Sequence, residues 1–384
     1  MSKALGRRLR LGMVGGGSGA FIGAVHRAAA RLDDRWELVA GALSSTPEKA
    51  RSFASELHIP RAYGSFEEMA AAESKHPERI DAVAIVTPNH MHYAIAKAFL
   101  EAGIHVMCDK PLTTTVEDAE KLTRQVEQSG LVFGLTHTYS GYPMVRQMRE
   151  MVLGGSIGPV RMIQVEYAQG WLATPLENTG AKQAEWRTDP KRSGPGGCLG
   201  DIATHAYHLA RFTTDLKPLE LSADLTTFVS GRRLDDNVQA LIRFEGGAKA
   251  SLWSSQIAIG EENNLNIRIY GEKASLSWSQ ENPNYVQLSR LNEPCCTLTR
   301  GGPGNGTAST QSTRLPTGHP EGYFEAFAQL YKDLAELISA RLEQRQPDQL
   351  ALLLPTCADG LAGVQFIDAA LRSSANNSGW TPLS

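Results

Sequence analysis

The segment Leu9–Gly23 reads LRLGMVGGGSGAFIG, six mostly apolar residues followed by five glycines within nine positions. Such a short apolar run is typical of a strand, and an amphipathic helical pattern begins near Ile22. Glycine lets the backbone turn sharply and approach a phosphate, and the start of a helix favours an anion. The segment therefore predicts a strand, a glycine-rich turn and a helix that bind a nucleotide. The alternative is a glycine-rich surface turn.

The same alternation of strand and helix continues to about residue 137. Strands are expected at 9–14, 36–43, 81–86, 104–108 and 131–136, and helices at 22–32, 47–57, 90–102 and 116–129. The strand runs are continuous and rich in Val and Ile, as in a parallel sheet that helices cover on both faces. This order predicts a doubly wound α/β domain over residues 1–137.

After about residue 140 the pattern changes to one helix-rich stretch followed by many strands. Helices are expected at 143–153 and 199–212, and strands at 160–167, 220–229, 237–244, 248–255, 264–270 and 274–278. Alternating polarity and the turn Glu245-Gly246-Gly247 predict antiparallel hairpins. We therefore expect a second domain over residues 138–384, with one face of its sheet covered by helices or by another subunit.

Three features near the C-terminus complete the expected organisation. Residues 301–318 are rich in Gly, Pro, Ser and Thr and are expected to be flexible. Helices are expected at 322–344 and 355–372. The last helix, counted as 355–373, is expected to pack back near the first domain.

Composition restricts the class of partner. The chain has 384 residues, 42% apolar and 21% charged, with a net charge of −3, which is typical of a globular protein large enough for two domains. The absence of a basic surplus argues against nucleic acid and a membrane surface as partners. Arg7-Arg8 resembles part of an export signal. The apolar run after it is too short for such a signal and serves as the first strand, so we expect a cytoplasmic protein. The five cysteines lack metal-site spacing and are expected to be reduced.

The residues expected to contact the nucleotide follow the ends of the predicted strands. They are Gly15, Gly17, Ser18, Phe21, Ile22, Ser44, Ser45, Lys49, Thr87, Asn89, His92, Asp109 and Lys110. An acid usually ends the second strand of an NAD site, whereas Ser44, Ser45 and Lys49 stand there in this chain, which favours NADP slightly over NAD. The loop at Thr87 and Asn89 is alternatively only a capping turn.

Two segments carry candidate chemistry. Lys110 follows the strand at 104–108, and Pro111 restricts the turn in which it lies. Asp201, His205 and His208 fall at i, i+4 and i+7, on one face of a regular helix. Three interpretations remain for them: a general base at His205 oriented by Asp201, a metal site, or histidines that pack between domains. We favour the first, with Lys110 assisting, and expect no metal.

Together, the glycine turn, Thr87-Pro88-Asn89, Asp109-Lys110-Pro111 and Gly200-Asp201…His205 resemble the Gfo/Idh/MocA oxidoreductases, the group of glucose-fructose oxidoreductase, inositol dehydrogenase and sugar ketoreductase. The resemblance implies an N-terminal Rossmann domain and a C-terminal α+β domain with an open, mostly antiparallel sheet. It also implies a homodimer or homotetramer through that sheet, and catalytic roles for Lys110, Asp201 and His205. Asp109 stands where the family carries glutamate, and the glycine turn contains an insertion.

A further set of side chains is expected to contact the substrate. It consists of His137, Tyr139, Trp186, Arg187, Arg192, His208 and His319. An indole face can stack on a sugar ring, and arginine and histidine can donate to hydroxyls, although Trp186 and Arg192 are alternatively a core residue and a surface ion pair.

These features predict an NAD(P)-dependent oxidoreductase that transfers a hydride between nicotinamide and a secondary alcohol or ketone of a cyclic polyol or sugar. Three alternatives remain. One is a non-catalytic dinucleotide sensor, one is an NAD-dependent glycosidase, and the third is a metal-dependent hydrolase centred on Asp201, His205 and His208.

Overall fold

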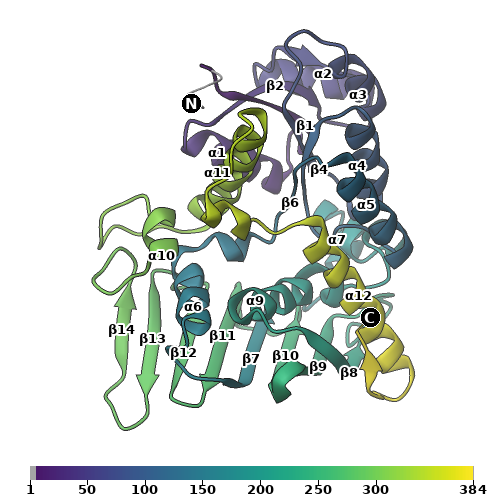
Figure 1. Cartoon of the computed structure of the whole chain (residues 1–384). Helices are drawn as coiled ribbons and strands as arrows, with labels where there is room; N and C mark the ends of the chain where they lie inside the picture. Colours follow the sequence, from purple (N-terminus) through teal and green to yellow (C-terminus); the bar gives the residue numbers. More distant parts are fainter. Residues whose placement is uncertain (1–5, 384) are drawn as a thin grey trace. The chain divides into compact units, whose positions relative to one another are not determined.

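The computed structural model describes residues 6–383 and divides into two compact units (Figure 1). Unit 1 comprises Met1–Gly141 and Tyr323–Leu361, and unit 2 comprises Tyr142–Gly322 and Ala362–Ser384. The sequence predicted domains over 1–137 and 138–384, with the helix at 355–373 packing back near the first. The contacts group 323–361 with the N-terminal unit. The functional limits 1–137 and 138–384 stay a prediction.

Unit 1 is built on a six-stranded parallel sheet in the order β3-β2-β1-β4-β5-β6. The strands are β1 (Leu9–Gly15), β2 (Trp36–Ala42), β3 (Arg61–Ala62), β4 (Ala82–Val86), β5 (His105–Cys108) and β6 (Phe133–Leu135). The helices are α1 (Phe21–Leu32), α2 (Pro47–Glu56), α3 (Phe66–Glu73), η1 (Asn89–Met91), α4 (His92–Glu101), α5 (Val116–Ser129), η2 (Thr138–Gly141), α11 (Tyr323–Leu342), η6 (Gln349–Leu353) and the start of α12 (Cys357–Ala375). The predicted doubly wound Rossmann domain is confirmed. The elements β3, α3, η2 and η6 were not predicted. A two-residue strand such as β3 gives no periodic signal.

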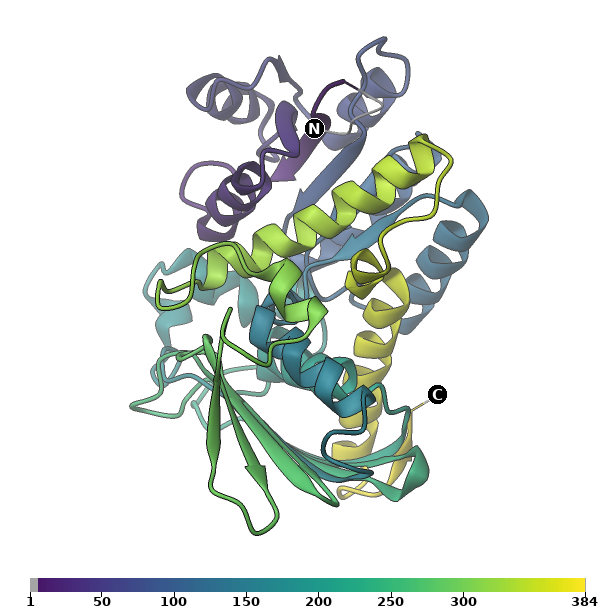
Figure 2. The ribbon, with the colours of Figure 1, turned by 60° about the vertical axis from the view of Figure 1, so that its left-hand side comes forward.

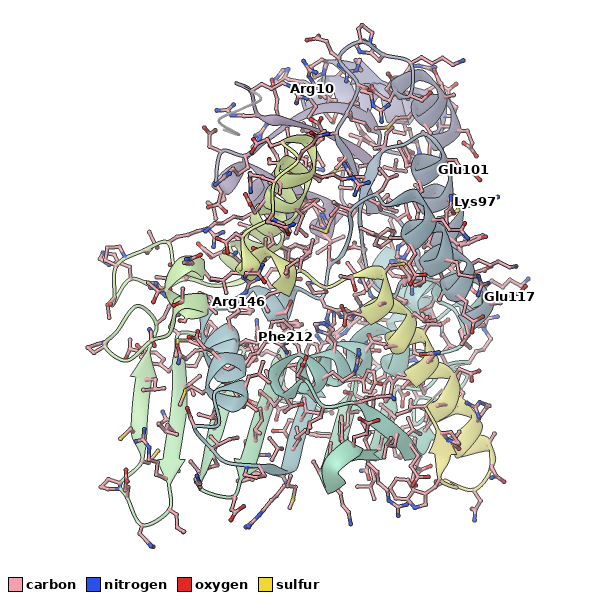
Figure 3. All side chains as sticks on the ribbon, in the orientation of Figure 1. Arg10, Lys97, Glu101, Glu117, Arg146 and Phe212 are labelled. Carbon is pink, nitrogen blue, oxygen red and sulfur yellow. The ribbon has the colours of Figure 1, made fainter. Side chains whose placement is uncertain are left out.

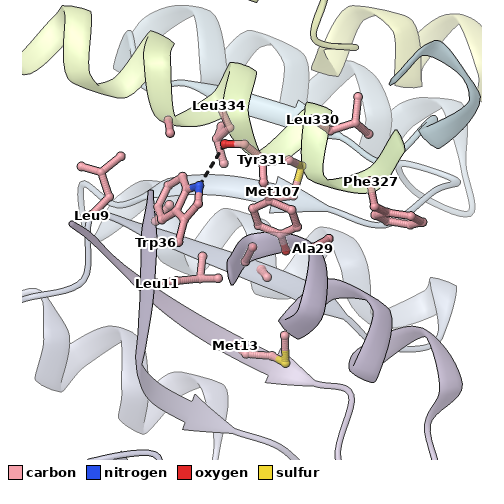
Figure 4. Packing of buried hydrophobic residues seen from close by; sticks show 14 of the residues in the cluster. Leu9, Leu11, Met13, Ala29, Trp36, Met107, Phe327, Leu330, Tyr331 and Leu334 are labelled. Carbon is pink, nitrogen blue, oxygen red and sulfur yellow. Dashed lines mark hydrogen bonds between the residues drawn. The ribbon is translucent and has the colours of Figure 1, made fainter. Parts of the chain in front are cut away.

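Helix α11 completes the hydrophobic core of unit 1, although it lies some 300 residues after β2 in the sequence. Trp36 on β2 is 3% exposed, and its Nε1 donates to the carbonyl oxygen of Tyr331 at 2.9 Å (Figure 4). Phe327 and Leu334 of the same helix join this cluster. Because a buried indole contributes a large apolar area and needs a hydrogen-bond acceptor, these contacts make α11 part of unit 1.

The outward faces of α4 and α5 carry charged side chains (Figure 3). Lys97 pairs with Glu101 at 3.7 Å, and Lys121 pairs with Glu117 at 2.6 Å. Exposed i,i+4 pairs of this kind contribute only tenths of a kcal/mol. The apolar inner faces, such as that of fully buried Phe99, therefore hold these helices in place.

Unit 2 is built on a nine-stranded sheet in the order β14-β13-β12-β11-β7-β10-β9-β8-β15. The strands are β7 (Val160–Ala168), β8 (Pro218–Thr226), β9 (Asn237–Phe244), β10 (Lys249–Ser255), β11 (Asn264–Gly271), β12 (Ala274–Ser279), β13 (Tyr285–Arg290), β14 (Cys296–Thr299) and β15 (Thr381–Pro382). The helices are α6 (Pro143–Leu153), η3 (Leu176–Asn178), α7 (Lys182–Arg187), α8 (Pro190–Ser193), the π turn η4 (Leu199–Ala203), α9 (Thr204–Thr214), η5 (Glu245–Gly247), α10 (Thr307–Ser312) and the end of α12. Neighbouring strands are antiparallel except for β7 and β10, which are parallel. The expected open, mostly antiparallel sheet is confirmed.

One face of the nine-stranded sheet is covered by α6 and α9 (Figure 2). The other face is open, and residues alternate between buried and exposed along β9. Met162, Leu241 and Tyr270 are large apolar side chains on this open face, 47%, 53% and 38% exposed. Polar side chains such as Lys249, Gln164 and Arg268 share this face with them.

The stretch 301–318 contains a helix and a hydrogen-bonded turn, so the expectation of a flexible segment was wrong. The guanidinium of Arg300, which is 2% exposed, donates to the carbonyl oxygen of Leu315 at 2.7 Å and to Glu321 Oε1 at 2.8 Å. Glu321 Oε1 also accepts from the backbone N–H of Arg314 and Leu315. One buried ion pair thus organises residues 313–321, which include the end of this linker-like stretch.

The segment Gln349–Ala375 is long and apolar enough to cross a membrane by length and composition. Half of its most apolar window is buried inside the structure. Buried helices of globular proteins pass the same test, so this segment is weak support for a membrane span.

His105, at the start of β5, should make stability depend on pH. Its Nδ1 accepts a hydrogen bond from the backbone N–H of Val132 at 2.9 Å, and burial followed by the charge of Arg341 lowers its pKa to about 4. Since the unfolded chain takes up the proton near pH 6.5, the stabilisation is complete above that pH and is lost as pH falls towards 4.

Between about pH 7 and pH 4, we expect the wild-type protein to lose up to roughly 3 kcal/mol more unfolding free energy than His105→Asn. Asparagine offers an acceptor oxygen at a similar position and does not titrate. Urea unfolding of both proteins across this pH range is the measurement. Parallel pH profiles would contradict the assignment.

Candidate functional site

The glycine turn after β1 brings three backbone segments into close contact. Gly15 has a φ of +80°, and a Cβ at this position would lie 2.2 Å from the carbonyl oxygen of Val86. A Cβ at Gly23 would lie 2.3 Å from the carbonyl oxygen of Gly16. Gly23 therefore acts as the glycine that allows close packing of the helix on the turn. Residues 18–20 are the three-residue insertion in the glycine pattern.

The start of α1 is available to an anionic group. Ala20 is the N-cap residue, and no side chain caps the helix. Unsatisfied backbone N–H groups at a helix start, together with the helix dipole, favour a phosphate. A cavity of about 450 Å³ adjoins this turn and is lined by Gly17, Ser18, Gly19, Ala20, Phe21, Ala24, Arg27, Phe53, Glu56 and Leu57. The turn and the uncapped helix fit a dinucleotide pyrophosphate.

Replacing Gly23 by alanine is expected to weaken dinucleotide binding at least about tenfold, or 1.4 kcal/mol. The new Cβ meets backbone rather than a flexible side chain, so the turn must shift. Titration of the protein with NAD measures the change in Kd. The matched control is Gly363→Ala, because nothing lies within 4 Å of a Cβ at Gly363. Equal Kd values for the two variants would show that this contact does not shape the site.

The remaining nucleotide-binding candidates of unit 1 lie at the ends of β2 and β4. Ser44 Oγ accepts from the backbone N–H of Thr46 at 3.2 Å, and Lys49 is exposed on α2. Asn89 is buried in η1. His92 is 1% exposed, with Nε2 lying 2.9 Å from the carbonyl oxygen of Thr87. His92 therefore contacts the loop after β4 from its buried side. Its direct contact with a cofactor stays a prediction.

Asp109 and Lys110 follow β5 at the carboxyl edge of the parallel sheet. Asp109 Oδ1 lies 3.1 Å from His26 Nε2 and accepts from Thr136 Oγ1 at 2.6 Å. Burial by itself raises the pKa of Asp109, but the charge and hydrogen bond of His26 and the hydrogen bond of Thr136 outweigh it and lower the pKa. His92 Nδ1 lies 2.7 Å from the carbonyl oxygen of Pro111. Buried side chains thus hold both neighbours of Lys110.

Two substrate candidates lie at the end of β6 in unit 1. His137 is 2% exposed and Tyr139 is 4% exposed. The carbonyl oxygen of His137 accepts from Ser140 Oγ at 2.8 Å, which fixes the turn after the strand. Their role in substrate binding stays a prediction, because both side chains lie inside the structure.

Unit 2 holds Asp201 between two polar side chains. Its Oδ2 accepts from Gln256 Nε2 at 2.9 Å and from Arg187 Nε at 3.2 Å. The Arg187 guanidinium in turn lies over the Trp186 ring, 4.3 Å from its centroid. Trp186 therefore supports Arg187, and Arg187 orients Asp201. Their direct contact with a substrate stays a prediction.

Asp201 lies in the π turn that precedes α9, whereas a regular α-helix was expected over 199–212. A π turn adds a residue to the helical repeat and is frequent at functional sites, so the expected 100° spacing does not hold across Asp201. Asp235 secures the start of this turn, because its carboxylate accepts from the backbone N–H of Gly197 at 2.6 Å and of Leu199 at 2.7 Å. Burial raises the pKa of Asp235 to about 6, although these two N–H groups favour its carboxylate.

The two histidines of α9 have different surroundings. His205 is half-buried, and its ring lies 6.3 Å from that of Tyr167. His208 is 4% exposed, and its ring lies 5.8 Å from that of Phe212 in a stacked arrangement. Burial, followed by the charge of Arg211, holds the pKa of His208 well below its usual value. The environment favours a packing role for His208, and its substrate role stays a prediction.

Across residues 6–383 no group of three or more His, Cys, Asp or Glu is arranged to hold a metal ion. The metal interpretation of Asp201, His205 and His208 therefore gains no support from the described side chains.

Two substrate candidates lie near segment ends of unit 2. Arg192 is half-buried in the short helix α8, and His319 is exposed in the turn after α10. The carbonyl oxygen of His319 accepts from the buried guanidinium of Arg300. That contact fixes the backbone of the turn and leaves its side chain exposed.

Comparison with known proteins matches both units to one family. Residues 9–137 match an oxidoreductase family with an NAD-binding Rossmann fold, and residues 145–277 match a GFO/IDH/MocA C-terminal domain. An uncharacterized oxidoreductase of Bacillus subtilis is 35% identical over 383 residues, 98% of each chain. The chain belongs to the Gfo/Idh/MocA oxidoreductase family.

Solved structures of this family align with nearly the whole chain. An oxidoreductase from Sinorhizobium meliloti is 50% identical with a TM-score of 0.88, covering 97% of this chain and 99% of that one. An inositol dehydrogenase homolog from Azotobacter vinelandii, complexed with NAD+, is 34% identical with a TM-score of 0.92, covering 98% and 97%. The expected family is therefore confirmed.

Sequence reasoning missed several side chains that support the site of this Gfo/Idh/MocA protein. They are His26, Arg27, Thr136, Asp235 and Gln256. Arg27 donates to the carbonyl oxygen of Gly16 at 2.6 Å, one helical turn after Gly23. The pair His26-Arg27 on the helix after the glycine turn was the available signal, because two polar side chains interrupt an otherwise alanine-rich stretch. Gln256 and Asp235 had no local signal, since their partners lie tens of residues away in the chain.

Proposed function

We propose that this protein is an NAD(P)-dependent dehydrogenase that transfers a hydride between nicotinamide and a secondary alcohol or ketone of a cyclic polyol or sugar. The observation that carries the proposal is Asp201, held by Arg187 and Gln256 four residues before His205. Lys110, which follows β5 in unit 1, is the other side chain proposed to take part in the reaction. Family membership supports the nicotinamide chemistry.

We infer the following roles for the side chains. His205 takes the proton of the reacting hydroxyl as general base, and Lys110 donates a hydrogen bond to the same oxygen. Asp201 accepts from Arg187 and Gln256 and orients the hydroxyl and the base. When bound, the nicotinamide ring supplies the hydride acceptor or donor. In ketone reduction the same residues return the proton.

A cyclic polyol such as an inositol is the leading substrate class. The Azotobacter homolog, 33% identical in a second complex, was solved with NADH and myo-inositol. Levoglucosan dehydrogenase of Pseudarthrobacter phenanthrenivorans is 30% identical over 55% of this chain, which keeps sugars as the second class. Both classes present ring hydroxyls, which can accept hydrogen bonds from a guanidinium such as that of Arg187, held over the Trp186 ring.

The Azotobacter homolog was solved with NAD+ and with NADH, so the slight expectation of NADP has no support there. A more distant relative is named D-xylose 1-dehydrogenase (NADP(+)) 2. We propose NAD as the first cofactor to test, with NADP alongside it. The homo-oligomer through the open face of the sheet, and the cytoplasmic location, also stay proposals.

The decisive experiment is an absorbance assay of inositols, hexoses and anhydrosugars with NAD and with NADP. Substrate-dependent formation of reduced nicotinamide supports the proposal. Release of an aglycone without net change in the cofactor would instead identify a glycosidase. Tight dinucleotide binding without turnover of any compound would favour a sensor.

A further inference from the structure

Two buried imidazoles flank Lys110 in unit 1. His26 on α1 is fully buried, and His92 on α4 is 1% exposed. His26 Nε2 lies 3.1 Å from Asp109 Oδ1, and His92 Nδ1 lies 2.7 Å from the carbonyl oxygen of Pro111. The residues directly before and after Lys110 are therefore each tied to a different helix.

Asp109 is held by more side chains than Pro111 is. Its Oδ1 accepts from Thr136 Oγ1 at 2.6 Å as well as facing His26. His26 Nδ1 lies 2.7 Å from the hydroxyl oxygen of Tyr331. Because a carboxylate oxygen can only accept, Nε2 of His26 must be the donor to Asp109. The chain Tyr331–His26–Asp109–Thr136 thus has a defined direction at the carboxylate.

Stability alone does not account for these polar groups. Burying a carboxylate and an imidazole is costly, and an apolar replacement of similar volume is often as stable or more stable. What such a cluster supplies is a single geometry, because every donor and acceptor restricts the position of the others. The geometry restricted here is that of the strand end from which Lys110 projects.

We propose that His26, Thr136 and His92 are positioning residues for Lys110, which set its place by fixing Asp109 and Pro111. This rests on the proposed function in assigning Lys110 to the reaction. The cluster itself lies wholly within unit 1, so it can be tested without reference to any substrate.

Thr136→Val is the first variant, because valine keeps the shape of threonine and lacks the hydroxyl. Thr136→Ser is its rescue, since serine keeps the hydroxyl. Thr213→Val is the matched control: Thr213 is fully buried in α9, and its hydroxyl donates to the carbonyl oxygen of Leu209 at 2.8 Å. His26→Phe removes the donor to Asp109 from the opposite side.

We expect Thr136→Val and His26→Phe to lower kcat at least about tenfold, because small displacements of a reacting group are costly. The Kd for NAD should stay within about twofold of the wild-type value, since both variants keep Asp109 and Lys110 and the small displacement affects the reacting step more than binding. Thr136→Ser and Thr213→Val should keep near-wild-type kcat. If kcat fell equally in Thr213→Val and Thr136→Val, the loss would come from reduced protein stability and not from the position of Lys110. That result would overturn the proposal.

A second readout uses the cofactor-free protein. The rate at which an amine-specific reagent labels Lys110, followed by peptide mass spectrometry, should change in Thr136→Val and His26→Phe and not in Thr136→Ser or Thr213→Val. Unchanged labelling in the first two variants would overturn the proposal even if kcat fell. If the wild-type protein oxidises no polyol or sugar, the proposed function fails while the labelling result still decides the positioning role.

Discussion

Replacing His205 by alanine should lower kcat at least about 10²-fold, the low end for loss of a general acid–base group. Lys110→Ala should lower kcat to a similar extent, because both side chains are assigned to one proton transfer. In His205→Ala the Kd for the dinucleotide should change little, and the loss should appear in kcat and kcat/KM together. Lys110 is also a candidate nucleotide contact, so NAD titration of Lys110→Ala separates a loss of binding from a loss of kcat. Steady-state assays with the best substrate of the screen, together with NAD titration, measure these quantities.

The controls for this prediction are a lysine and a histidine outside the candidate site. Lys97→Ala removes an exposed lysine of α4, and His76→Ala removes a half-buried histidine of the loop after α3. Both should keep near-wild-type kcat. Turnover close to wild type in His205→Ala and Lys110→Ala would reject the catalytic assignment. A loss confined to one of them would assign the proton transfer to that residue alone.

Replacing Arg300 by methionine should lower the free energy of unfolding by about 3–5 kcal/mol, the usual cost of leaving one partner of a buried ion pair alone. Arg300 and Glu321 are each 2% exposed at the side chain and lie 2.8 Å apart. The guanidinium also holds backbone oxygens at Leu315 and Pro316. The variant thus leaves a buried carboxylate and several carbonyl groups without their donor. Urea unfolding with a constant m-value measures the loss.

The matched control is Arg290→Met. Arg290 pairs with Glu293 at 3.6 Å, but the two side chains are 47% and 57% exposed, so the expected loss is at most about 1 kcal/mol. The double variant Arg300→Met/Glu321→Gln should recover part of the stability, because it removes the unpaired charge. Equal losses in Arg300→Met and Arg290→Met would contradict the view that this pair organises residues 313–321.

Local sequence was informative wherever a segment carried its own periodic pattern. The apolar run at 9–14 and the glycines after it predicted β1, the turn and α1 to within a residue or two. The alternation at 237–244 predicted β9 with its observed limits. β13 shows a similar alternation in Tyr-Val-Gln-Leu-Ser-Arg, yet it was missed, because its polar positions weaken the apolar signal.

The surroundings of the candidate catalytic residues were not available from any local pattern. Asp109 and Lys110 were found because they directly follow a strand, whereas His26, which holds Asp109, lies 83 residues earlier. Gln256, which holds Asp201, lies 55 residues later. The π turn at 199–203 was read as ordinary helix, because periodicity over five residues cannot distinguish the two.

The sequence by itself determined the family, the parallel sheet of unit 1 and the identity of the candidate site residues, because strand ends, glycine turns and short motifs are local features. Only the tertiary structure decided that α11 belongs to the core around Trp36, that β7 pairs in parallel with β10, and that His92 and His208 are enclosed. Each of these depends on contacts between residues far apart in the chain. Such contacts form when burial and hydrogen bonding together offset the chain entropy lost in closing the loops between them.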